Sequence, residues 1–110
     1  MQPKIDLQRQ KILDEIVAKI IIIAHPKKII LFGSASRGQM GYHSDFDLLI
    51  VVDNSTPCRR TTQAIYRDLV GIGFATDIIT IHEEDAEFQK NQEGTIVRTA
   101  LTEGKILHVS

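Results

Sequence analysis

Two aspartates at alternate positions, Asp45 and Asp47, have the residue type and the spacing that most directly suggest chemistry in this chain. They open an apolar run that predicts a strand, and side chains two residues apart on a strand point to the same face. Paired carboxylates can hold a hard divalent cation, and Mg²⁺ typically binds through one or two carboxylates together with substrate phosphates. The pair therefore predicts a site for Mg²⁺ and a phosphorylated substrate.

A Gly-Ser turn, Gly33-Ser34, precedes this pair, and the ten residues 35–44 separate the two features. A turn that contains glycine lets backbone N–H groups approach a phosphate closely. Arg37 follows the turn and could meet a phosphate oxygen, although an ordinary surface arginine is an equal alternative. A phosphate-binding turn beside a Mg²⁺-binding pair is the minimum equipment for transfer chemistry on a nucleoside triphosphate.

A third aspartate, Asp77, lies thirty residues after Asp47 in another apolar segment, 75–81. An unpaired charge among apolar residues is costly to bury, so a cation, a basic partner or a helix N-terminus is needed nearby. If the two strands are neighbours, Asp77 lies beside the pair, and cations would relieve the repulsion of three carboxylates. Each aspartate alone is more often structural, but the combination with the Gly-Ser turn favours a nucleotide site.

The composition limits the class of protein. A chain of 110 residues predicts one domain, 1–110, and 43% hydrophobic and 25% charged residues are ordinary for a globular protein. Thirteen basic and fourteen acidic residues offer no support for nucleic-acid binding. The single cysteine, Cys58, excludes an intramolecular disulfide, and we expect it to be unreactive. No signal sequence or membrane span is evident, so we expect a cytoplasmic protein.

The hydrophobic pattern predicts an α/β (α+β) fold in which a small mixed β-sheet is flanked by helices. The strand over 45–52 is apolar on both faces after its aspartates, which places it in the middle of the sheet. Thr56 is the expected N-cap of the second long helix, with Pro57 at its first position. The predicted helices are 6–24, 35–37, 57–70, 83–91 and 95–103, and the predicted strands are 28–32, 45–52, 75–81 and 106–109.

The end of the first predicted helix, Ile20 to Ile23, is apolar on all sides. Burial against the sheet accounts for about two of these four side chains. The remainder suggest an exposed apolar patch and therefore a partner or homo-oligomer surface.

The motif residues resemble a known family. The arrangement of Gly33-Ser34, ten residues, and Asp45-Phe46-Asp47, followed by Asp77, is similar to the DNA polymerase beta-like nucleotidyltransferase superfamily. The phrases LFGSASRG and SDFDLLIVV resemble its minimal nucleotidyltransferase (MNT) branch, and the likeness covers most of the chain. One departure is Ala35, where many relatives have an arginine directly after the Gly-Ser pair.

The resemblance implies the nucleotidyltransferase fold and a set of roles. Asp45 and Asp47 would bind two Mg²⁺ ions, and Asp77 would bind the catalytic ion and help to deprotonate the attacking hydroxyl. Gly33, Ser34 and Arg37 would bind the triphosphate. The implied reaction is in-line attack on the α-phosphorus of ATP or another NTP, with release of pyrophosphate. Relatives of this size are commonly paired with an all-helical HEPN toxin, and the MNT protein, as antitoxin, can transfer AMP to a tyrosine of that partner.

Several functions compete with a Mg²⁺-dependent protein nucleotidyltransferase. An antitoxin that neutralises its partner by binding alone would not need the aspartates. A small-molecule nucleotidyltransferase of the antibiotic-modifying type is disfavoured, because such enzymes normally carry a further domain for the acceptor. A template-directed polymerase is disfavoured by size and charge.

Overall fold

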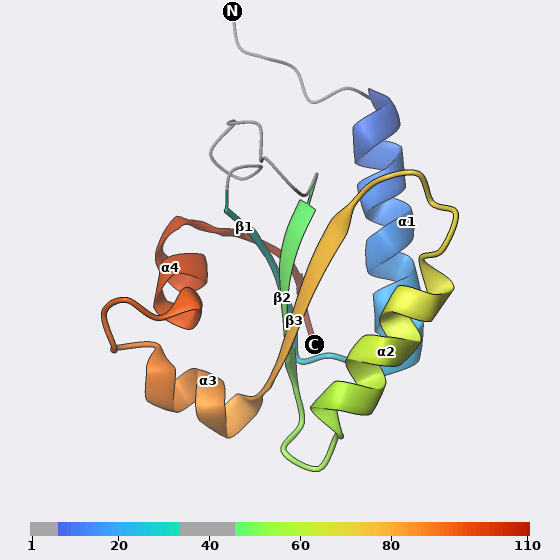
Figure 1. The fold of residues 1–110 in the computed structure, drawn as a ribbon. Helices are drawn as coiled ribbons and strands as arrows, with labels where there is room; N and C mark the ends of the chain where they lie inside the picture. Colours follow the sequence, from blue (N-terminus) through green and yellow to red (C-terminus); the bar gives the residue numbers. More distant parts are fainter. Residues whose placement is uncertain (1–6, 34–45) are drawn as a thin grey trace, which may run out of the picture.

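A four-stranded mixed sheet runs through the molecule, and helices cover both of its faces (Figure 1). The computed structural model describes residues 7–33 and 46–110. The strand order is β3-β2-β1-β4, with β2 and β3 parallel and the other neighbours antiparallel. The predicted fold class is confirmed. The elements are α1 (Leu7–Ala24), β1 (Lys28–Phe32), β2 (Phe46–Val52), α2 (Cys58–Asp68), β3 (Thr76–His82), α3 (Glu83–Gln89), α4 (Ile96–Glu103) and β4 (Lys105–Val109).

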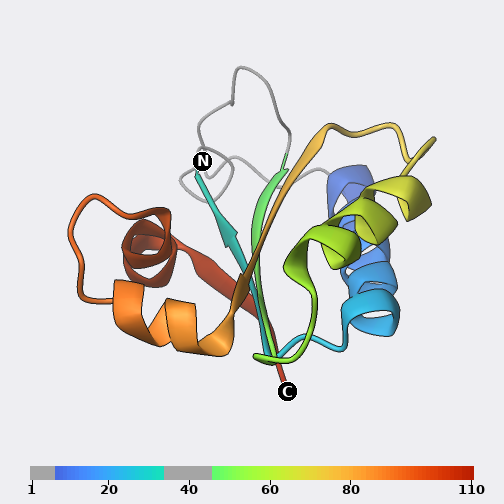
Figure 2. The same cartoon turned by 60° about the horizontal axis from the view of Figure 1, so that its bottom comes forward.

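The two faces of the sheet carry different helices: α1 and α2 lie on one side, and α3 and α4 on the other (Figure 2). On the first side, Ile16 and Ile20 of α1 pack with Leu48 of β2. On the second, Val97 of α4 packs with Leu49. Because alternate side chains of a strand point to opposite faces, β2 supplies both cores and must be apolar on both faces. Its burial, complete apart from half-buried Asp47, confirms the predicted central position.

The connection from β2 to the parallel strand β3 passes through a turn and helix α2. The side-chain oxygen of Asp53 accepts hydrogen bonds from the N–H and hydroxyl of Ser55, and these bonds lower the pKa of Asp53. Thr56 donates its N–H to the Asp53 carbonyl and therefore belongs to this turn. Helix α2 has Pro57 at its N-cap without a side-chain cap, so the predicted Thr56 cap is wrong by one residue.

Helix α2 also protects the outer edge of β3. The hydroxyl of Tyr66 accepts the N–H of Ile78 at 2.8 Å, and the hydroxyls of Thr62 and Thr80 lie 2.8 Å apart. An edge strand normally presents unpaired backbone groups that can recruit another strand. Side chains from α2 therefore occupy part of the edge that β3 would otherwise expose.

The isoleucine run at the end of α1 contributes less exposed apolar surface than its composition predicts. Ile20 is fully buried, and Ile21 and Ile23 pack against the core beside α1. Ile22 alone of the four is largely exposed, at 73%. The expected patch is thus reduced to one side chain. Among the described residues, no helix has the length and apolar character needed to cross a bilayer.

Gly104 joins α4 to β4 at a place where backbone and side chains approach closely. An added Cβ would lie 2.4 Å from the Ala100 carbonyl oxygen and 2.7 Å from Cγ2 of Ile30. We expect Gly104→Ala to lower the free energy of unfolding by about 1–3 kcal/mol, as overpacking does in other cores. Urea denaturation measures this loss.

Gly71→Ala is a matched control for that substitution. Gly71 has φ +87° and no atom within 4 Å of an added Cβ, so its replacement introduces backbone strain without a clash. The expected loss is about 1 kcal/mol. A Gly104→Ala variant as stable as wild type would contradict the steric argument.

Candidate functional site

Two of the predicted carboxylates are direct neighbours. Asp47 on β2 and Asp77 on β3 are register partners in the parallel ladder, so their side chains project from the same face of the sheet. Asp47 is half-buried and Asp77 is exposed. On the other side of β2, Phe32 at the end of β1 is the register partner of Asp47. The end of β1 and the starts of β2 and β3 therefore meet at one end of the sheet.

Gly33, the described residue of the predicted Gly-Ser turn, lies close to Asp47, one member of this carboxylate pair. Its φ is +76°, a left-handed conformation that glycine adopts without strain. An ideal Cβ on Gly33 would lie 2.4 Å from Oδ2 of Asp47 and 3.2 Å from its Cγ. A side chain at position 33 would therefore displace the carboxylate. The position requires glycine for its backbone conformation and for its closeness to Asp47.

Ser34, Arg37 and Asp45 lie outside the described residues, so their assigned roles stay predictions. Within the described ranges, no group of three His, Cys, Asp or Glu side chains could hold a metal ion. Asp47 and Asp77 supply two carboxylate groups, and oxygen donors are the ligands that Mg²⁺ prefers. The donor chemistry of the described pair fits Mg²⁺, and Asp45 is the predicted third ligand.

A stack of three side chains lies on the opposite face of the sheet, directly behind the carboxylates. The rings of Phe46 and Phe74 are stacked with centroids 5.7 Å apart. The guanidinium carbon of Arg9, on α1, lies 4.9 Å from the Phe46 centroid and 5.6 Å from the Phe74 centroid. Sequence reasoning missed this stack. The apolar residue between Asp45 and Asp47 predicts a buried ring, but nothing in the sequence links it to Arg9.

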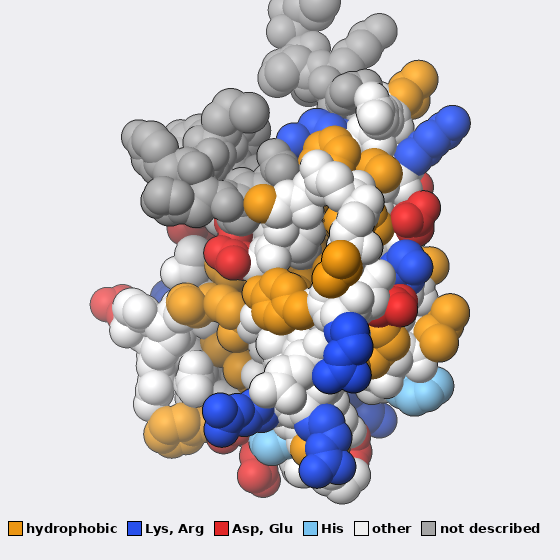
Figure 3. Space-filling model, turned by 45° about the vertical axis from the view of Figure 1, so that its right-hand side comes forward, with side chains coloured by type: hydrophobic (Ala, Val, Ile, Leu, Met, Phe, Trp, Pro, Cys, Tyr) orange, Lys and Arg blue, Asp and Glu red, His pale blue; other side chains and the backbone are white. Residues whose placement is uncertain are grey.

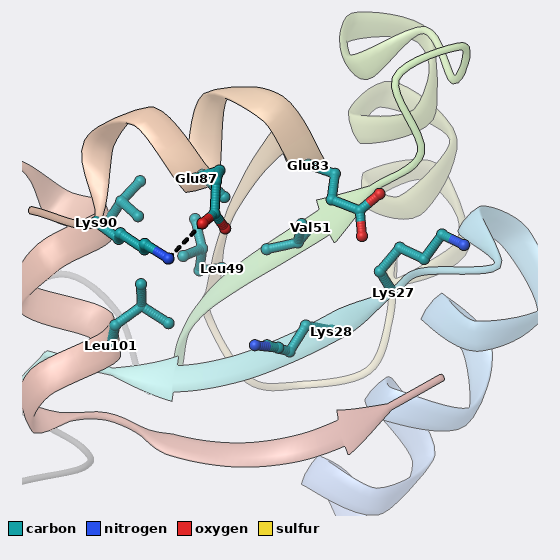
Figure 4. A pocket seen from close by; sticks show the side chains of 10 residues that line it. Lys27, Lys28, Leu49, Val51, Glu83, Glu87, Lys90 and Leu101 are labelled. Atoms are coloured by element: carbon teal, nitrogen blue, oxygen red, sulfur yellow. Dashed lines mark hydrogen bonds and ion pairs between the residues drawn. The ribbon is translucent and has the colours of Figure 1, made fainter.

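A pocket of about 320 Å³ lies at the other end of the carboxylate-bearing face, between the sheet and helices α3 and α4 (Figure 4). Leu49 and Val51, in its floor, are two and four residues along β2 from Asp47, or roughly 7 and 13 Å at the rise of a strand. Its remaining lining is aliphatic or charged, including the ion pair of Lys90 with Glu87. Neither Asp47 nor Asp77 lines the pocket, and its lining offers no thiol, hydroxyl or imidazole for chemistry.

The cysteine and a nearby histidine have structural surroundings. Burial raises the pKa of the Cys58 thiol, and the charge of Asp85 raises it further. A raised pKa reduces the thiolate fraction, in keeping with the expected lack of reactivity. His82 Nε2 lies 2.6 Å from the Thr56 carbonyl oxygen, linking the end of β3 to the turn before α2.

The surface in Figure 3 gives no indication of a nucleic-acid site on that face. Lys and Arg side chains are interspersed there with acidic, apolar and uncharged ones. A nucleic-acid-binding face typically gathers basic residues into a continuous patch or stripe.

The fold agrees with a class of protein, the nucleotidyltransferases. The family model of the nucleotidyltransferase domain matches residues 9–107, which is most of the chain. The chain therefore belongs to the nucleotidyltransferase domain family. A search of curated proteins found no match.

Two solved structures share the fold. A candidate nucleotidyltransferase from Sulfolobus solfataricus aligns with a TM-score of 0.59 at 18% identity, over 96% of this chain and 90% of that chain. A toxin–antitoxin structure with AMP-PNP aligns with a TM-score of 0.51 at 22% identity, over 88% of this chain and 73% of that chain. At these identities the likeness establishes the fold.

Proposed function

We propose that this protein transfers a nucleoside monophosphate, AMP from ATP as the first choice, to a hydroxyl group of a partner protein. The observation that carries this proposal is the in-register pair of Asp47 and Asp77 beside Gly33, in a chain of the nucleotidyltransferase family. A glycine turn for phosphates and two carboxylates for Mg²⁺ are the parts that such a transfer needs.

In the proposed reaction, the acceptor oxygen forms a bond to the α-phosphorus while the bond from that phosphorus to the bridging oxygen breaks. The acceptor hydroxyl loses its proton, and pyrophosphate leaves with the electron pair of the broken bond. Asp77 is the proposed acceptor of that proton. Gly33, Ser34 and Arg37 would position the triphosphate, and Asp47 and Asp45 would hold Mg²⁺ together with Asp77. When bound, Mg²⁺ would stabilise the negative charge that develops on the phosphate oxygens.

The proposed setting is a toxin–antitoxin pair, in which the acceptor is a tyrosine of a helical HEPN-type toxin. The structural likeness to a toxin–antitoxin structure with AMP-PNP supports this setting. The acceptor would then be recognised on the partner.

Calorimetry of ATP binding with and without Mg²⁺ tests the site. We expect Mg²⁺-dependent binding to wild type and none to Asp47→Asn. Asp14→Asn, an exposed carboxylate on α1, is the matched control and should bind as wild type does. If wild type binds none of the four nucleoside triphosphates, alone or with its toxin, the transferase proposal fails. An Asp47→Asn variant that still neutralises the toxin would then favour an antitoxin that acts by binding alone.

A further inference from the structure

We propose that the Arg9–Phe46–Phe74 stack positions the carboxylate pair by holding the starts of β2 and β3 at a fixed separation. This inference rests on the proposed function, because it assigns to the stack the geometry that metal binding and transfer require. The stack lies on the face of the sheet opposite the carboxylates. Its members are positioning residues, since they act through the backbone and not by contact with a substrate.

The contacts of the stack join three separate parts of the chain. Phe46 is the first residue of β2 and immediately precedes Asp47. Phe74 lies two residues before β3 and three before Asp77. The guanidinium of Arg9 lies over both rings, so α1 is joined to the start of each carboxylate-bearing strand. Phe46 is 3% exposed, which leaves its ring no alternative position in solvent.

The starts of β2 and β3 need such support because few backbone hydrogen bonds join the two strands there. The β2–β3 ladder begins at the Phe46–Thr76 pair, with one further bond from the Phe46 N–H to the Ala75 carbonyl at 3.2 Å. Asp47 and Asp77 are the next pair along the ladder. Element ends open more readily than their centres, whereas a metal site must be held within about 0.5 Å of its working geometry. The stack therefore adds side-chain contacts at the end of the ladder, where the fewest backbone hydrogen bonds hold the strands together.

The test compares stack variants with matched controls outside the stack. Phe74→Leu removes a ring, Arg9→Met removes the cation but keeps an unbranched side chain, and Arg9→Lys keeps the cation. Phe88→Leu, at an exposed residue of α3, is the control for Phe74→Leu. Arg60→Met, at an exposed arginine of α2, is the control for Arg9→Met. Ile65→Val, which leaves a small cavity where α2 packs on the core, controls for loss of stability.

We expect Phe74→Leu and Arg9→Met to weaken Mn²⁺ binding, measured by electron paramagnetic resonance, by about tenfold, the lower end of the range seen when the support of metal ligands is removed. The kcat for transfer should fall at least as far, while KM for ATP changes less. Arg9→Lys should recover most of the Mn²⁺ affinity. The proposal is overturned if both stack variants bind Mn²⁺ as wild type does, or if Ile65→Val loses affinity to the same extent at an equal drop in melting temperature.

Hydrogen exchange separates this proposal from the proposed function. In Phe74→Leu and Arg9→Met, amide exchange should be faster than in wild type at residues 46–48 and 76–78 and unchanged at the centre of the sheet. If wild type binds neither Mn²⁺ nor MgATP, the proposed function fails, and selective exchange at the strand starts would still support a positioning stack. The proposal is overturned if exchange in the stack variants rises equally across the whole sheet, or if it does not rise above the wild-type rate.

Discussion

Asp77→Asn is expected to lose transfer activity by about 10²–10⁴-fold, the usual contribution of a general base, while it retains MgATP binding. The strand order explains the separation of the two effects. Asp47 lies on the central strand β2, between Gly33 at the end of β1 and Asp77 on the edge strand β3. Asp77 is therefore one strand further from Gly33. Transfer of label from α-³²P-ATP to the proposed toxin partner would measure activity, and calorimetry measures binding.

Asp47→Asn should behave differently and lose both transfer and MgATP binding. An ideal Cβ on Gly33 would lie 2.4 Å from Oδ2 of Asp47, so in the proposed site this carboxylate would act on the triphosphate and on Mg²⁺ together. Equal loss of MgATP binding in the two variants would contradict distinct roles for the two carboxylates. Wild-type transfer by Asp77→Asn would remove Asp77 from the proposed site.

Gly33→Ala is expected to weaken MgATP binding at least tenfold and to lower the free energy of unfolding by about 1–2 kcal/mol. The energetic loss comes from φ +76°, which an alanine adopts only with strain. The loss of binding comes from the carboxylate, because the new methyl group would occupy the space of Asp47 Oδ2 at 2.4 Å. Calorimetry and urea denaturation of the same preparation measure the two effects.

The Gly71→Ala variant introduced above also serves as the control here. It carries a similar strain, at φ +87°, far from any atom that a methyl group would meet. It should lose stability and keep MgATP affinity. If Gly33→Ala binds MgATP as tightly as Gly71→Ala does, the closeness of Gly33 to Asp47 has no role in nucleotide binding.

Sequence patterns predicted the elements that position the site because those elements have strong local signals. The strand at 28–32 is observed with those bounds, and Thr95 caps α4 by accepting the Arg98 N–H at 3.1 Å. The adjacency of Asp47 and Asp77 was predicted only on condition that their strands pair. Parallel pairing through a crossover helix satisfies that condition, and such connections follow strong topological rules.

The features that sequence reasoning missed depend on contacts between distant segments. Arg9 meets Phe46 only because α1 packs across the first face of the sheet. The pocket beside Val51 needs α3 and α4 to fold back over the second face. The error at Thr56 has a different origin. Thr56 donates its N–H to the Asp53 carbonyl and so belongs to the turn before α2, which leaves Pro57 as the N-cap. The hydrophobic periodicity of a single segment does not predict which distant segments it will contact.

The hydroxyl of Tyr66 on the Ile78 N–H limits how copies of this protein can assemble. A sheet recruits further strands at its edges, and growth into a fibre needs two edges that are both open. Here β3 at one edge has a backbone donor already engaged by a side chain, and β4 forms the other edge of the sheet. Two molecules joined edge to edge through β4 would form a closed pair around a twofold axis. Continued strand addition at the β3 edge would have to displace the Tyr66 hydroxyl from the Ile78 N–H.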